Sequence, residues 1–178
     1  MAAAGSGGWM NVNTDKLELK KISIDSVEHA LEKAELYRLL NDPEQAESIC
    51  KDVLVVDPGH DKAKRLLILA LTDQFAGSAT TSDAKRAREL CRQLAEPYEQ
   101  QYFGGLVCER EARAFLHKGL AGSFAFESFL EAMTFFEEAE KLSPPHNDDA
   151  ILRWNSCLRT IRARQLRRRA DEPEMPLE

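Results

Sequence analysis

Histidine and carboxylate side chains gather at two predicted turns, where they could bind a metal ion or transfer a proton. Residues 57–61 include Asp57, His60 and Asp61, and residues 146–149 hold one histidine and two aspartates. Neither group has the ligand spacing of a zinc site. Turns and helix starts use the same residue types for local hydrogen bonds, so we assign both groups to turn and cap positions and predict no metal and no cofactor.

The cysteines are not placed for nucleophilic catalysis. Cys108 is followed by Glu109 and then Glu111, whose negative charges discourage thiolate formation. The four cysteines lie far apart in apolar helical patterns, which predicts free buried thiols in a reducing compartment: Cys50, Cys91, Cys108 and Cys157. The chain also lacks a nucleophile elbow, a phosphate loop and a zinc-protease helix, so we expect a protein that is not an enzyme.

The end of the chain carries the sharpest charge pattern. Between Ala150 and Ala170 there is no acidic residue but a series of arginines: Arg153, Arg159, Arg162, Arg164, Arg167, Arg168 and Arg169. Such a stretch is either a solvated capping helix or a surface for an acidic protein, RNA or a charged lipid headgroup. The formal net charge of −6 and the lack of interleaved aromatics beyond Trp154 disfavour nucleic acid, for which residues 159–169 are the one candidate site.

Composition points to one helical domain. The chain has 178 residues, of which 43% are hydrophobic, and these are enough for a continuous core. Glu, Ala, Leu and Arg are abundant while Val, Ile and Thr are sparse, which favours helices over strands. No stretch resembles a signal peptide or approaches the ~20 apolar residues of a membrane span. We therefore expect a cytoplasmic protein.

Apolar periodicity and turn residues divide the chain into seven predicted helices. Asp42-Pro43 starts the second, Asp57-Pro58-Gly59 ends it, and Pro144-Pro145 ends the sixth. The predicted helices cover residues 26–40, 42–56, 61–75, 82–94, 98–117, 123–143 and 147–168. We expect Asp25 to cap the first and Pro97 to end or kink the fourth. Residues 1–22 are predicted to form a flexible segment, residues 23–168 the helical domain, and residues 169–178 an acidic flexible tail.

Small and aromatic residues recur at the spacing of a helical hairpin. In the first pair of helices they are Ala34, Tyr37, Ala46, Val53 and Pro58. The steps of four, three and five residues that join Ala46, Cys50, Val53 and Pro58 occur again late in the chain, at Ala132, Phe136, Ala139 and Pro144. Small residues let two helices approach, and such a hairpin needs stacked neighbours to bury its apolar face.

These residues resemble the tetratricopeptide repeat family, whose unit is a pair of helices in 34 residues. The likeness covers roughly residues 26–165 and is degenerate, because Ala30 stands where the family has Trp and Lys33 where Leu is usual. It implies an all-α fold, a right-handed superhelical stack of antiparallel helix pairs with about three hairpins and a C-terminal capping helix.

The resemblance also implies a binding surface and a function. Family members bind peptides or partner helices in a concave groove lined by the first helix of each pair. Carried over by position, the candidate groove residues are Arg38, Arg65, Arg113 and His117, and Asn155 holds a clamp-like place in the last helix. The arginine-rich stretch adds Arg159 and Arg162 as candidates by its charge. The expected function is a non-catalytic scaffold or adaptor for a protein partner. Two alternatives stay open: binding of nucleic acid or an anionic surface through the last helix, and self-association into a homo-oligomer.

Overall fold

The computed structural model describes residues 17–77 and 81–168, and within them all regular secondary structure is helical. The elements are η2 (Ile24–Ser26), α1 (Val27–Leu39), α2 (Pro43–Val56), α3 (Asp61–Asp73), α4 (Thr81–Arg92), α5 (Pro97–His117), α6 (Gly122–Lys141) and α7 (Asp149–Ala163). The all-α expectation is confirmed for this part of the chain. Residues 17–23 have no regular secondary structure. Most of the predicted flexible segment and the whole acidic tail, residues 1–16 and 169–178, lie outside the described residues.

Local chemistry explains where several helices begin. The Asp42 carboxylate accepts from the backbone N–H of Gln45 at 3.2 Å, and Pro43 occupies the first turn of α2. His60 Nδ1 caps α3 by accepting from the N–H of Ala63 at 3.3 Å. Pro97 begins α5 rather than ending the preceding helix, because a missing N–H does no harm in a first turn.

Two further predicted boundaries are wrong. Asp25 does not cap α1, because the chain enters α1 through the 3₁₀ turn η2 and Ser26, without a side-chain cap bond, holds the cap position. The last helix ends at Ala163 instead of reaching Arg168. There Gln165 adopts a left-handed φ of 52° and the N–H of Leu166 donates to the carbonyl of Ile161 at 3.0 Å, which is a Schellman motif built without glycine.

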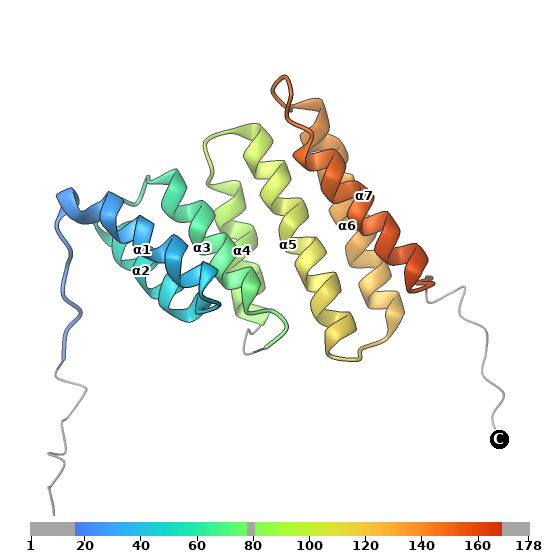
Figure 1. Cartoon of the computed structure of the whole chain (residues 1–178), viewed down its shortest axis with the longest axis horizontal. Helices are drawn as coiled ribbons and strands as arrows, with labels where there is room; N and C mark the ends of the chain where they lie inside the picture. The colour runs from blue at the N-terminus through green and yellow to red at the C-terminus, as the bar shows by residue number, and fades with distance from the viewer. Residues whose placement is uncertain (1–16, 78–80, 169–178) are drawn as a thin grey trace, which may run out of the picture.

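The helices pack side by side in a row that runs from α1 to α7 (Figure 1). Each helix contacts the next one along the chain. In addition α1 contacts α3, α3 contacts α5, and α5 contacts α7. The odd-numbered helices therefore form a continuous set of neighbours, and the two ends of the row are the α1–α2 pair and α7.

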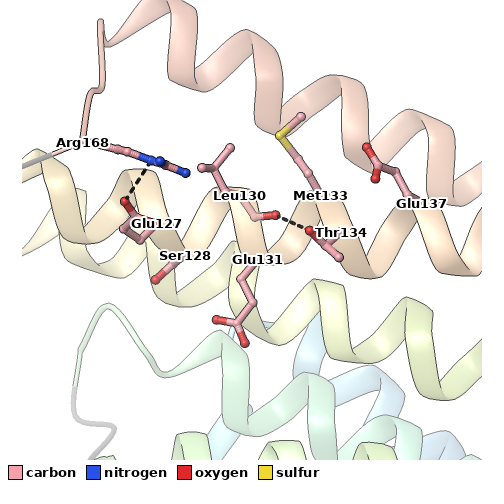
Figure 2. A pocket seen from close by; sticks show the side chains of 8 residues that line it. All are labelled: Glu127, Ser128, Leu130, Glu131, Met133, Thr134, Glu137 and Arg168. Atoms are coloured by element: carbon pink, nitrogen blue, oxygen red, sulfur yellow. Dashed lines mark hydrogen bonds and ion pairs between the residues drawn. The ribbon is translucent and has the colours of Figure 1, made fainter. Parts of the chain in front are cut away.

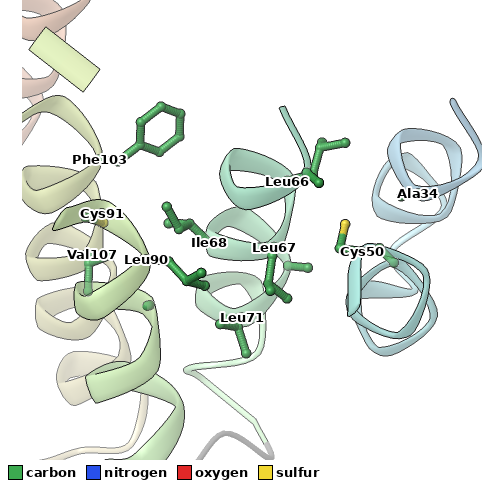
Figure 3. Packing of buried hydrophobic residues seen from close by; sticks show 14 of the residues in the cluster. Ala34, Cys50, Leu66, Leu67, Ile68, Leu71, Leu90, Cys91, Phe103 and Val107 are labelled. Atoms are coloured by element: carbon green, nitrogen blue, oxygen red, sulfur yellow. The ribbon is translucent and has the colours of Figure 1, made fainter. Parts of the chain in front are cut away.

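Two clusters of buried residues lie along this row, and α5 contributes to both. In α3, Leu67 lies on the side of Cys50 and Ala34 while Ile68 lies on the side of Phe103, so this helix is covered on both sides (Figure 3). Six predicted packing residues are buried: Ala34, Ala46, Val53, Ala132, Phe136 and Ala139. Tyr37 is half-buried in the first cluster, and Pro58 and Pro144 follow the ends of α2 and α6.

Two glycines let α5 and α6 approach closely. A Cβ on Gly105 would lie 2.7 Å from the ring of Phe136, and one on Gly104 would lie 3.0 Å from the ring of Phe135. Real carbon atoms in contact sit about 3.5–4.0 Å apart. The glycine pair is thus a close helix contact, and it does not end α5, which continues through it to His117.

Candidate partner-docking surface

The arginines predicted to line a groove are used to join helices. Arg38 of α1 donates from Nε to Asp73 of α3 at 2.8 Å. Arg65 of α3 donates from Nη1 to both carboxylate oxygens of Glu99 in α5, each at 2.9 Å. These side chains are partly exposed, but each has its charge neutralised by a neighbouring helix.

Asp73 connects three of the odd helices. Besides Arg38 it pairs with Arg110 of α5, which also donates to the hydroxyl of Thr72 at 3.0 Å. Burial lowers the pKa of Arg110, while the Asp73 carboxylate opposes that shift. Arg110 is a site residue that was not predicted from the sequence, where its one local signal is its position one turn before Arg113.

A buried carboxylate joins α5 to α7. Glu109 is 1% exposed, and its Oε1 accepts from Nε and Nη2 of Arg113 at 3.0 and 2.8 Å. Its Oε2 lies 3.5 Å from Nη1 of Arg153 in α7. Arg113 also donates to Ser156 of α7 at 3.0 Å and lies over the ring of Phe129, 5.7 Å from its centroid. A carboxylate this buried is stable only because both arginines are paired with it.

The same pairing extends over the whole chain up to Arg153. Each arginine from position 38 to position 153 pairs with a carboxylate within the described residues: Arg38, Arg65, Arg86, Arg88, Arg92, Arg110, Arg113 and Arg153. A partner that used these guanidinium groups would first have to compete with an internal ion pair.

The pattern changes at the end of α7. Arg159, Arg162, Arg164 and Arg167 form no ion pair within the parts of the chain that the structure describes, and all four are exposed. Arg168 is the exception, with Nε 3.6 Å from Glu127 of α6. Four positive charges are therefore presented to solvent at one end of the row.

Two of these arginines share a face of α7 with Asn155. Positions 152, 155, 159 and 162 are three or four residues apart and so lie on one side of the helix, opposite the buried Ala150 and Cys157. We call Leu152, Asn155, Arg159 and Arg162 the α7 outward face. Leu152 is 62% exposed and Asn155 is half-buried. His117, also a predicted site residue, is exposed on the last turn of α5, on a different helix from this face.

Beside α7, α6 presents acidic residues. A shallow cavity of about 580 Å³ is lined by Glu127, Ser128, Leu130, Glu131, Met133, Thr134, Glu137 and Arg168 (Figure 2). Trp154 of α7 donates from Nε1 to Glu137 at 2.9 Å, which holds its indole against α6. This surface would repel a long polyanion that extended from α7 onto α6.

Within the described residues, no site is assembled for thiol catalysis or for metal binding. All four cysteines are free and buried, and burial raises the pKa of each thiol from 9.0 to about 12. No grouping of three or more His, Cys, Asp or Glu side chains within the described residues could hold a metal ion. In the same residues, no helix combines the length and the apolar character that crossing a bilayer requires.

Comparisons with known proteins do not identify the chain: no protein-family model matches it, and no curated protein matches it either.

Proposed function

We propose that this protein is a non-catalytic interaction scaffold that docks an acidic protein segment on the α7 outward face. The proposed architecture is a right-handed superhelical stack of hairpins similar to tetratricopeptide repeats. Support for the stack comes from the contacts of α1 with α3, α3 with α5, and α5 with α7, which a layered repeat requires.

The single observation that carries the docking surface is the contrast in arginine pairing along the chain. A ligand carboxylate that binds Arg159 or Arg162 displaces no carboxylate of the described residues, because neither side chain has an ion-pair partner among them. At Arg38 or Arg65 the same carboxylate would have to replace Asp73 or Glu99. The net binding free energy of such a carboxylate is therefore more favourable at the α7 arginines than at Arg38 or Arg65.

A protein segment suits this face better than nucleic acid. Nucleic-acid binding surfaces combine positive charge with exposed aromatic rings for stacking, and the aromatic residue of α7, Trp154, is half-buried and hydrogen-bonded to Glu137. Leu152 adds an apolar contact at the other end of the face, as an amphipathic partner would need.

The test compares a fluorescein-labelled Glu/Leu-rich helical peptide with a single-stranded RNA of equal charge, using fluorescence anisotropy at several salt concentrations. We expect the peptide to bind more tightly than the RNA. The double variant Arg159→Glu/Arg162→Glu should weaken peptide binding at least tenfold, on the order of 1.4 kcal/mol.

The matched control is Arg92→Glu/Lys141→Glu, which makes the same change in net charge at exposed positions of α4 and α6. It should retain most of the binding, and circular dichroism should show that both variants keep their helices. Tighter binding of the RNA, or equal losses in the two variants, would refute the proposed site.

A further inference from the structure

The two ends of the helical row carry opposite charge. Residues 24–57, which form η2, α1 and α2, contain nine acidic and three basic residues, a net charge of −6. Residues 150–168, at the opposite end, contain six arginines and no acidic residue, a net charge of +6. The charge of the chain is thus strongly polarised along the row, although the two ends cancel in the total.

Both ends also expose leucine side chains. Leu36 of α1 is 44% exposed, and Leu40, the C-cap residue of α1, is 65% exposed. The N–H of Leu40 donates to the carbonyl of Leu36 at 2.9 Å, so the two residues keep the helical spacing that places them on one face. Glu32, one turn earlier on that face, has a side chain that is 71% exposed, and its Oε2 lies 3.8 Å from Nδ1 of His29. We call Glu32, Leu36 and Leu40 the N-terminal edge. On α7 the corresponding apolar residue is Leu152.

We infer that the N-terminal edge of one copy of this chain docks on the α7 outward face of a second copy. This inference rests on the proposed function, because it names the acidic partner of the same face. In Figure 1 the α1–α2 pair and α7 lie at opposite ends of the row, so the two surfaces cannot meet within one chain. Contact between them requires a neighbouring molecule.

Charge and apolar pattern both match in this arrangement. Arg159 and Arg162 face the acidic hairpin of the neighbour, and Leu152 meets Leu36 and Leu40. An isologous pairing of two α7 helices would instead bring like charges together, and so would a pairing of two N-terminal edges. The contact is therefore head to tail. A dimer formed in this way still has one free N-terminal edge and one free α7 outward face, so that chains of copies can grow.

The experiment blocks each end separately in the full-length protein. Here the head is the N-terminal edge and the tail is the α7 outward face. The head-blocked variant is Glu32→Lys/Leu36→Lys, and the tail-blocked variant is Leu152→Glu/Arg159→Glu. All four positions are exposed, so both variants should fold, which circular dichroism checks. Sedimentation velocity at 10–500 µM and low salt measures the size of each species.

We expect the wild-type protein to form dimers and longer species as its concentration rises, and added salt to reverse this association. Each blocked variant alone should stay monomeric. An equimolar mixture of the two should form a dimer and nothing larger, because the free tail of one binds the free head of the other. The control Arg92→Glu/Lys141→Glu should associate as the wild-type protein does.

Three outcomes would overturn the inference: a wild-type protein that is monomeric at every concentration, a blocked variant that still dimerises, or a mixture that stays monomeric. The acidic peptide separates this failure from that of the proposed function. If the peptide still binds to α7 while self-association is absent, only the choice of partner is wrong. If the peptide does not bind either, the α7 outward face is not a docking site.

Discussion

The contact between α5 and α6 offers the sharpest test of the packing, through the substitution Gly105→Ala. The added Cβ would lie 2.7, 2.8 and 3.0 Å from three ring carbons of Phe136. This ring is 1% exposed and packs against Tyr102, with the ring centroids 6.0 Å apart, so it has little room to move. The two helices would have to separate to accept the methyl group.

Two opposing effects set the magnitude. Overpacking of a core costs about 1–3 kcal/mol, and replacing glycine by alanine inside a helix returns roughly 1 kcal/mol. Because Phe136 has so little room, the cost lies in the upper part of that range, about 2–3 kcal/mol. The balance is then a destabilisation of about 1–2 kcal/mol, or a fall of roughly 2–8 °C in Tm for a chain of this size. Urea unfolding followed by circular dichroism measures the change in the free energy of unfolding.

Gly104→Ala is the matched control, one residue away in the same helix. Its Cβ would lie 3.0 Å from the ring of Phe135, which is half-buried and can shift by a few tenths of an ångström. We expect a change of less than about 0.5 kcal/mol, because the gain in helix propensity offsets a milder contact. The reasoning is refuted if Gly105→Ala is as stable as the wild-type protein, or if Gly104→Ala is the less stable of the two.

Two further predictions concern buried ionisable groups. Glu109→Gln removes the counter-charge of Arg113 and Arg153, whose side chains are 43% and 40% exposed and can be partly rehydrated. We therefore expect the free energy of unfolding to fall by about 1–3 kcal/mol. An unchanged urea midpoint, or hydrogen exchange in α7 no faster than in the wild-type protein, would contradict this role. The four thiols should be unreactive toward a disulfide reagent at pH 8 in the folded protein and all react after unfolding, because burial raises their pKa to about 12. Since the unfolded thiols ionise first, near pH 9, unfolding should become easier as the pH rises from 9 toward 12, and a urea midpoint that is constant over this range would count against buried neutral thiols.

Helix positions and most core residues could be predicted because their signals are local. Asp42 and Pro43 act within the first turn of α2, and the apolar residues of a helix recur every three or four positions, so both signals lie in short stretches of sequence. The end of α7 was missed for the same reason, since Gln165 in a left-handed conformation carries none of the glycine or proline signals that usually mark a helix end.

The candidate site depended on contacts that sequence spacing does not reveal. Residue types and their spacing are enough to predict an all-helical chain, hairpins with small residues at their seams, and an arginine-rich end. Which arginines are neutralised depends on tertiary contacts, because Arg38 and Asp73 are 35 residues apart and Arg153 and Glu109 are 44 apart. Ion pairing depends on distance in space, and packing of the odd-numbered helices brings these groups together while it leaves Arg159 and Arg162 without a neighbouring carboxylate in the described residues.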